Sequence, residues 1–320
     1  MIGKDLQKAA KYLEEGELVG IPTETVYGLA GNALDERAVS QIFKVKNRPT
    51  FDPLIVHTDS IEKVQAFVSE FSPTALLLSR HFWAGAMTLL LPKKPIVPDL
   101  VTSGSPLVAI RIPNHPLTLA LLRSLPFPLA APSANPFGYI SPTTAQHVAA
   151  QLGDKIPYIL DGGACDLGLE STIIGFENNV PTIYRKGGLS VEAIEQVVGK
   201  VQVKTFSTSN PQAPGMLKSH YAPRIPLIIG NIEELISQFA DRNIGILSFR
   251  KHFPQVNEKH QIALSAAGDL AEAAKHLFAA MRHLDGLDLE VILAELLPEQ
   301  DLGRAINDRL RRAAAINKDE

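Results

Sequence analysis

Residues 18–25 read LVGIPTET, a short apolar strand that runs directly into two threonine hydroxyls and one carboxylate. A helix is predicted before it, because Leu6, Ala9 and Leu13 recur at helical spacing and Gly16 stands where a helix stop is expected. A helix that leads into a strand with a polar end is typical of α/β folds, in which clefts form at strand ends. Taken alone, PTET is also compatible with a turn whose threonines bond their own backbone.

The same pattern recurs up to residue 204. His57 directly follows the apolar run at 54–56, and Arg111 lies within LVAIRI at 107–112. A buried guanidinium is costly without a partner, so Arg111 favours an anionic ligand, whereas a lone histidine in such a place is more often structural. Strands are predicted at 54–56, 87–91, 107–112, 129–131, 159–160, 171–175 and 182–185, and helices at 35–45, 61–71, 73–82, 116–125, 143–151 and 190–198.

A second cationic feature is KVKNRP at 44–49, just after a predicted helix. If the chain is extended there, as Pro49 encourages, Lys46 and Arg48 point to the same side. Two cations on one side suit a polyphosphate, with arginine as a planar fork and lysine as a point charge. A solvated basic helix end is the alternative interpretation.

Small polar groups follow other strands. Ser133 and Asn135 lie in APSAN at 131–135, where they can approach a ribose or phosphate or can form a capped turn. Ser141-Pro142-Thr143 resembles a helix N-cap, and a helix N-terminus is also an anion site. Because such groups recur at strand ends, the sequence predicts a polar cleft.

Composition limits the alternatives. The 320 residues are 45% hydrophobic and 20% charged with a net charge of −3, which argues against broad electrostatic binding of nucleic acid or membrane. Cys165 is the single cysteine, so no intrachain disulfide is available. The N-terminal segment is typical of an amphipathic helix rather than of a signal peptide. We therefore expect a cytoplasmic protein without membrane contact. No P-loop or G-x-G-x-x-G motif occurs, so any ATP site is of an unusual type.

The predicted domains are 1–204, a linker at 205–224 and a smaller domain at 225–320. The linker is rich in serine, proline and glycine and lacks apolar periodicity. After it, predicted strands at 225–229, 244–249, 261–264 and 291–296 alternate with helices at 232–239, 267–284 and 303–315. This alternation predicts a small parallel, Rossmann-like α/β domain.

Nine motifs in this order resemble the YrdC-like family in its two-domain form, the threonylcarbamoyl-AMP synthases. They are PTETVYGL (22–29), K-x-R-P (46–49), PLIVH (53–57), AIRIP (109–113), S-x-N (133–135), SPT (141–143), EST (170–172), R-K-G (185–187) and PGMLKSHYAP (214–223). Each is weak alone, but together they span essentially the whole chain. The resemblance implies a twisted mixed sheet with flanking helices for the first domain.

The resemblance also implies a reaction, in which L-threonine, bicarbonate (or CO2) and ATP give threonylcarbamoyl-AMP and pyrophosphate. Mg²⁺ would travel with the ATP phosphates. Family members pass the product to a threonylcarbamoyl-transferase complex, which modifies the adenosine beside the anticodon of ANN-reading tRNAs. A weak direct contact with tRNA is part of this expectation.

The residues that match the family's sites form two groups. The L-threonine group is Thr25, His57, Arg111, Ala131 and Ser171. The ATP group is Lys46, Arg48, Asp52, Leu107, Ser133, Asn135, Ser141, Arg185 and Tyr221, with Lys46 and Arg48 as the catalytic cations and the linker closing over the cleft. Two positions depart from the pattern: Asp52 replaces the usual asparagine, and Leu107 stands where threonine is common.

Two other functions compete with this one. A non-catalytic RNA-binding module is possible on a concave basic surface, although the mild acidity and the lack of a basic or aromatic stripe count against it. A carbamoyl-transfer enzyme of hydrogenase maturation would need further modules and cysteines that this chain lacks.

Overall fold

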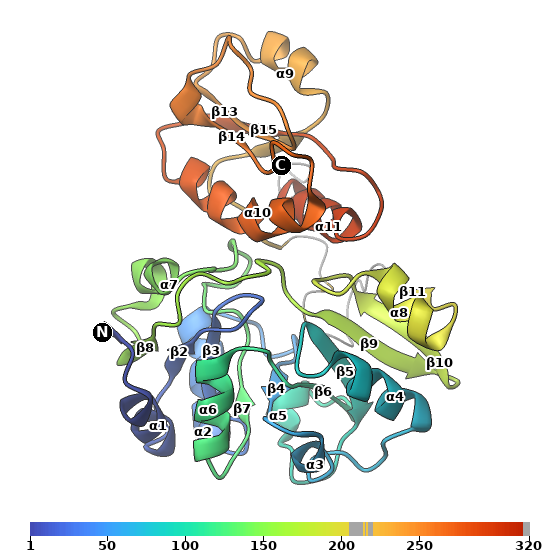
Figure 1. The fold of residues 1–320 in the computed structure, drawn as a ribbon. Coiled ribbons are helices and arrows are strands. Elements are labelled where there is room, and N and C mark those ends of the chain that lie inside the picture. The colour runs from blue at the N-terminus through green and yellow to red at the C-terminus, as the bar shows by residue number, and fades with distance from the viewer. Residues whose placement is uncertain (205–213, 215, 217–219, 316–320) are drawn as a thin grey trace. The chain divides into compact units, whose positions relative to one another are not determined.

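The computed structural model describes residues 1–204, 214, 216 and 220–315, which form two compact units (Figure 1). The N-terminal unit comprises Met1–Phe137, Ser141–Asp166 and Glu170–Leu217. The C-terminal unit comprises Gly138–Ile140, Leu167–Leu169 and Lys218–Glu320. Most of the predicted linker at 205–224 lies outside the described residues. The predicted fold class, a twisted mixed sheet plus a smaller α/β domain, is confirmed.

Within the described residues, the N-terminal unit contains an eleven-stranded sheet in the order β1-β8-β2-β3-β7-β4-β6-β5-β9-β10-β11. The sheet is mixed, because it contains parallel pairs such as β4 with β6 and antiparallel pairs such as β5 with β6. The strands are β1 (Ile2–Gly3), β2 (Val19–Ile21), β3 (Gly28–Asn32), β4 (Ile55–His57), β5 (Met87–Pro92), β6 (Leu107–Arg111), β7 (Leu129–Ala130), β8 (Tyr158–Leu160), β9 (Thr172–Glu177), β10 (Val180–Arg185) and β11 (Gln202–Val203).

Most helices of this unit begin at side chains that accept hydrogen bonds from the first turn, as Asp5, Asp35, Ser72, Thr144 and Ser190 do. They are α1 (Leu6–Glu14), α2 (Glu36–Lys46), α3 (Ile61–Val64), α4 (Pro73–Phe82), α5 (Asp99–Thr102), α6 (Pro116–Ser124), α7 (Ala145–Leu152) and α8 (Val191–Val198). The N-cap of α7 is therefore Thr144 rather than the predicted Ser141.

One predicted helix is much shorter than expected. The pattern at 61–71 predicts a helix throughout, but α3 ends at Val64. Beyond it, Phe67 O accepts from Lys94 N and Pro92 O accepts from Ser69 N, so the backbone pairs with the end of β5. Tertiary hydrogen bonds override the local helical pattern here.

The two faces of the sheet are covered differently. The main core packs α2, α4, α5, α7 and α8 against one face. On the other face, α1 and α6 cover β2, β3, β7 and β8. Over β4, β5, β6 and β9 this second face carries instead a small apolar cluster that includes Ile55, Ala109, Ile173 and Met216.

Strand geometry places polar groups beside this cluster. Alternate residues of a strand share a face, so His57 lies with Ile55, and Arg111 lies with Ala109. The β4–β6 register also aligns Ile55 with Ala109 and His57 with Arg111. The region that the described helices leave uncovered is therefore the region where the predicted site residues gather.

The C-terminal unit has a wholly parallel sheet in the order β12-β15-β13-β14, as predicted. Its elements are β12 (Leu227–Ile229), α9 (Ile232–Gln238), β13 (Ile244–Ser248), a 3-10 turn (Glu258–His260), β14 (Gln261–Ala263), α10 (Leu270–Asp285), β15 (Val291–Ala294) and α11 (Gly303–Ala313). Across the described part of the chain, no helix has the length and apolarity needed to cross a membrane.

Asp285, at the end of α10, holds the chain segment that leads into β12. Its carboxylate is buried and accepts from the backbone N–H groups of Arg224 and Ile225 at 2.7 and 3.0 Å, from Arg224 Nε at 3.1 Å and from the hydroxyl of Tyr139. Ala222 N donates to Gly138 O at 2.8 Å. One carboxylate thus ties the start of the domain to segment 138–140.

Candidate active site

Arg111 organises the predicted amino-acid site. The side chain is 3% exposed, and it donates from Nη1 to Thr25 Oγ1 at 2.8 Å and from Nε to Gly85 O at 3.1 Å. Nη2 lies 2.6 Å from Glu24 Oε1. Thr25 is held in turn by Thr23, whose hydroxyl lies 2.7 Å from that of Thr25 and donates to Val26 O. The turn reading of PTET is therefore correct as well, because the same turn presents Thr25 to Arg111.

His57 lies next to Arg111 in register and is almost fully buried. Burial, together with the positive charge of Arg111, lowers the pKa of His57 to about 3. The ring is consequently neutral at physiological pH, and Nδ1 lies 3.3 Å from Ile55 O. A neutral histidine can hydrogen-bond a substrate without competing with Arg111 for its carboxylate.

Ser171 and Arg185 come together although they were predicted for different substrates. Arg185 donates from Nε and Nη2 to Ser171 O and from Nη2 to Ser171 Oγ, at 2.9–3.1 Å. Gly187 makes this approach feasible, since a Cβ there would lie 2.3 Å from Glu170 O. The R-K-G turn therefore packs directly on the EST motif.

Residues 85–88 connect these two groups. Gly85 O accepts from Arg111 Nε, Ala86 O accepts from Thr172 N at 2.9 Å, and Thr88 Oγ1 lies 2.7 Å from Ser171 Oγ. The chain thus brings Thr25, His57, Arg111 and Ser171 into one polar region of the sheet face.

The backbone conformation at Lys46 differs from the extended one that was predicted. It is the last residue of α2, and Asn47 ends the helix in the left-handed conformation (φ 52°), so the chain is not extended at 46–47. Lys46 Nζ donates to the carbonyl oxygens of Ser133 and Asn135, each at 2.5 Å. Burial and the nearby Arg48 charge lower the pKa of Lys46 well below its ordinary value.

Arg48 is largely engaged by its own loop. Nε donates to Asp52 O at 3.0 Å, Nη2 donates to Pro53 O at 2.7 Å, and Nη2 forms a 2.9 Å ion pair with Asp52 Oδ2. The guanidinium also lies over the Phe137 ring, 5.7 Å from its centroid. Asp52 thus partly offsets the positive charge that the sequence predicts for phosphate binding.

Asn135 and Ser141 lie on two further loops of the N-terminal unit. Asn135 is buried and donates from Nδ2 to Pro136 O at 2.8 Å. Ser141 is fully buried, and its hydroxyl donates to Glu170 Oε1 at 2.6 Å. Glu170 precedes Ser171, so Ser141 lies beside the group held by Arg185.

Three predicted residues behave differently. Ala131 is buried, and its N–H donates to Ile55 O at 3.0 Å, which ties it to β4. Leu107 lies at the opposite end of β6 from Arg111, about 13 Å away at the usual strand rise. Tyr221 belongs to the C-terminal unit, where it stacks on Phe278 at 5.6 Å and lies under Arg309. A contact of Tyr221 with ATP remains a prediction.

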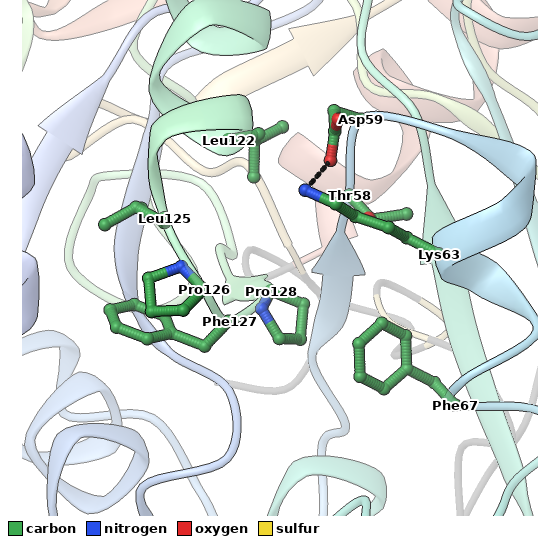
Figure 2. Close-up of a pocket in the computed structure, with 9 residues that line it drawn as sticks. All are labelled: Thr58, Asp59, Lys63, Phe67, Leu122, Leu125, Pro126, Phe127 and Pro128. Carbon is green, nitrogen blue, oxygen red and sulfur yellow. Dashed lines mark ion pairs between the residues drawn. The ribbon is translucent and has the colours of Figure 1, made fainter.

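A cavity of about 130 Å³ opens near the end of β4 (Figure 2). It is lined by Thr58, Asp59, Lys63, Phe67, Leu122, Leu125, Pro126, Phe127 and Pro128. An ion pair of 2.7 Å between Asp59 and Lys63 spans one side of it. None of the predicted site residues lines this cavity, so we assign it no substrate.

Sequence reasoning gave no separate role to Glu24, Thr88, His115 or Glu170. Glu24 lies inside the quoted PTET motif, and Glu170 inside EST, so the motifs themselves carried the signal. His115, at the start of α6, carries a pKa lowered mainly by burial. In the described residues, no group of three or more His, Cys, Asp and Glu side chains is placed to hold a metal.

Comparisons with known proteins agree along the whole chain. A family model described as Telomere recombination (Sua5_yciO_yrdC) matches residues 11–187, and one described as Threonylcarbamoyl-AMP synthase, C-terminal domain, matches residues 189–315. The chain is 41% identical to the threonylcarbamoyl-AMP synthase of Pyrococcus abyssi, covering 96% of this chain and 93% of the relative. It is 40% identical to that of Bacillus subtilis, covering 97% and 92%.

A solved structure agrees with these relatives. The crystal structure of P. abyssi Sua5 complexed with L-threonine superposes with a TM-score of 0.93 at 38% identity, covering 98% of this chain and 97% of that one. The resemblance stated from the nine motifs is confirmed. The chain therefore belongs to the threonylcarbamoyl-AMP synthase family, in its two-domain form, and is an enzyme of this kind.

Proposed function

We propose that this enzyme condenses L-threonine, bicarbonate (or CO2) and ATP into threonylcarbamoyl-AMP and pyrophosphate. The observation that carries the proposal is the Arg111 group. A guanidinium on the uncovered sheet face, bonded to Thr25 and flanked by neutral His57, suits the carboxylate and hydroxyl of a small hydroxy amino acid. The relatives' name and the threonine in the related crystal structure support this choice of substrate.

The proposed chemistry has two bond-forming steps. The threonine nitrogen attacks the carbon of bicarbonate, and water leaves as the carbamate forms. A carbamate oxygen then attacks the α-phosphorus of ATP, the bond between the α- and β-phosphates breaks, and pyrophosphate leaves. No protein nucleophile takes part. The protein acts by positioning and by electrostatic stabilisation.

Lys46 and Arg48 supply the positive charge in this proposal. Lys46 is buried between two carbonyl oxygens, and phosphate oxygens would favour its protonated form. Ser133, Asn135, Ser141 and Arg185 surround the same loops and are proposed to position the nucleotide. Mg²⁺ is proposed to enter with ATP, ligated mainly by phosphates and water. No step depends on a metal bound by side chains.

The linker is proposed to close over the cleft and to keep water from the labile product. Two described residues of this segment support the idea. Met216 packs with Ile55, Ala109 and Ile173, and Pro214 O lies 3.4 Å from Arg185 Nη1. Both contacts lie on the sheet face that carries His57 and Arg111. Tyr221 at the linker's end is proposed to reach ATP in the closed state.

In the cell, we propose, the product passes in the cytoplasm to a threonylcarbamoyl-transferase complex that modifies the adenosine beside the anticodon of ANN-reading tRNAs. A weak direct contact with tRNA is part of this proposal.

The test is pyrophosphate release by the purified protein with L-threonine, bicarbonate and ATP. We expect release to require threonine and to be abolished by Lys46→Ala or Arg48→Ala. Lys44→Ala, on the exposed side of the same helix, is the matched control and should retain activity. Release that does not depend on threonine would refute the proposed function.

A further inference from the structure

Glu24 is a buried carboxylate with unmet hydrogen-bonding capacity. Its side chain is 12% exposed, and both of its oxygens are buried without a hydrogen-bond donor among the described residues. The 2.6 Å contact with Arg111 Nη2 is an ion pair that lacks hydrogen-bond alignment. A buried carboxylate in this condition is costly to the fold, so its position points to a ligand that donates to it.

Arg111 has a donor group that lacks an aligned hydrogen-bond acceptor. Nε and Nη1 are bonded to Gly85 and Thr25, whereas the buried Nη2 makes no aligned hydrogen bond. The charged donor and the charged acceptor lie side by side as an ion pair, and neither has an aligned hydrogen bond among the described residues. An α-amino acid presents the matching pair on a single carbon, a carboxylate that accepts from Nη2 and an ammonium that donates to the Glu24 oxygens.

Among the described residues, Arg111 is the cation that pairs with Glu24. His115, whose pKa burial lowers, also has a buried Nδ1 without a hydrogen-bond partner. Burial and the Glu24 charge both raise the pKa of Cys165, here to about 12, so the thiol stays neutral. The described groups around Glu24 can thus accept or remain neutral, but they do not replace an ammonium.

We propose that Glu24 receives the α-ammonium group of the amino-acid substrate and so selects an amino acid over a hydroxy acid of the same shape. This assignment rests on the proposed function, because it takes threonine as the substrate. Arg111 then fixes the carboxylate, Glu24 the nitrogen and Thr25 a polar group between them. Glu24 is a specificity-determining residue whose effect depends on the charge of the substrate nitrogen.

The test compares L-threonine with 3-hydroxybutyrate, which lacks the amino group, by isothermal titration calorimetry of the full chain without ATP. In Glu24→Gln, L-threonine should bind about 10–100-fold more weakly, the usual value of a charged hydrogen bond. Binding of 3-hydroxybutyrate should be unchanged or tighter, because an anion near its carboxylate is removed. Glu14→Gln, on the exposed face of α1, should change neither.

The other outcomes are equally decisive. Equal weakening of both ligands, or no loss for threonine, overturns the assignment and leaves Glu24 as a support for Arg111. If Glu24→Gln does not fold, Glu24→Asp decides, since a shorter carboxylate should weaken threonine binding more than 3-hydroxybutyrate binding. A wild-type chain that binds no threonine refutes the proposed function itself.

Discussion

Glu24 and Asp285 are both buried carboxylates beside an arginine, yet they differ in what else reaches their oxygens. Asp285 accepts from two backbone N–H groups, from Arg224 and from Tyr139. Glu24 has only its ion pair with Arg111, and no hydrogen-bond donor in the described residues reaches it. The C-terminal unit therefore supplies hydrogen-bond donors to the buried Asp285 carboxylate, whereas the described N-terminal unit supplies none to the Glu24 carboxylate.

This difference in hydrogen bonding distinguishes a buried carboxylate that stabilises the fold from one that is available to a ligand. A fully bonded carboxylate such as Asp285 stabilises one arrangement of the chain, and its removal leaves several donors without an acceptor. An incompletely bonded group, such as Glu24 or Arg111 Nη2, costs stability until a ligand arrives. Mutations in the two regions should therefore affect different measurements.

The largest expected effect is on stability in the C-terminal unit. Asp285→Ala should lower the free energy of unfolding by about 3 kcal/mol, because two backbone N–H groups and the Tyr139 hydroxyl lose their acceptor. Urea denaturation of the purified protein measures it. Asp288→Ala, at an exposed carboxylate three residues on, is the control. A loss below about 1 kcal/mol would mean that the network around Asp285 is not structural.

The next effect is on substrate binding in the N-terminal unit. Arg111→Lys keeps the charge but loses the fork that engages Thr25, Gly85 and Glu24. We expect the KM for L-threonine to rise about 100-fold, or about 2.7 kcal/mol, with a smaller change in the KM for ATP. Steady-state pyrophosphate release measures both constants, with exposed Arg123→Lys as the control. Equal rises in both would place Arg111 outside the threonine site.

A third prediction concerns pH. The pKa of His57 is lowered to about 3 in the folded state, against about 6.5 in an unfolded chain. Below pH 6.5 the unfolded state takes up a proton that the folded state refuses, so the stabilising contribution of His57 is present above 6.5 and is lost as the pH falls towards 3.

Between pH 7 and 5, wild type should therefore lose about 2 kcal/mol more unfolding free energy than His57→Gln. Denaturation curves at the two pH values measure the difference. Exposed His252→Gln should behave like wild type. Parallel losses in wild type and His57→Gln would show that the imidazole is not held neutral by the fold.

The smallest effect concerns the Arg48–Asp52 pair, in which a carboxylate offsets a proposed phosphate-binding charge. Asp52→Asn should tighten ATP binding about fivefold, or about 1 kcal/mol, because Arg48 then keeps its full charge for the phosphates. Titration calorimetry with ATP measures it, and Asp154→Asn is an exposed control. Weaker ATP binding in Asp52→Asn would instead show that Asp52 orients Arg48.

Much of the N-terminal unit could be predicted from local pattern. The apolar runs before His57 and Arg111 became β4 and β6, and α4 begins and ends where the spacing predicts. The pairing that joins Glu24 to Arg111 could not be predicted, because register and side-chain direction are set by long-range packing. The candidate site was accordingly named residue by residue, but its contacts were not.

Elsewhere the misses have specific causes. β3 has the sequence GLAGN, and its glycines weaken the sequence signal for a strand. Glycine is nevertheless needed at position 31, because a Cβ there would lie 2.8 Å from the Leu18 side chain. Lys46 was predicted to begin an extended segment because of Pro49, although asparagine is a residue type that can end a helix in the left-handed conformation, as Asn47 does. Asp285 gave no signal, since its partners lie 60–146 positions away in the sequence.

The membership of segments 138–140 and 167–169 in the C-terminal unit has a consequence for the order of synthesis. Both segments leave the ribosome early, but Tyr139 must wait for Asp285, which follows 146 positions later. Domains generally fold as units and N-terminal first during translation. The stretches that lead out of S-x-N and into EST therefore gain their native partners only when the chain is nearly complete. A nascent chain that has already formed its large sheet would therefore complete the loops of the candidate site only later.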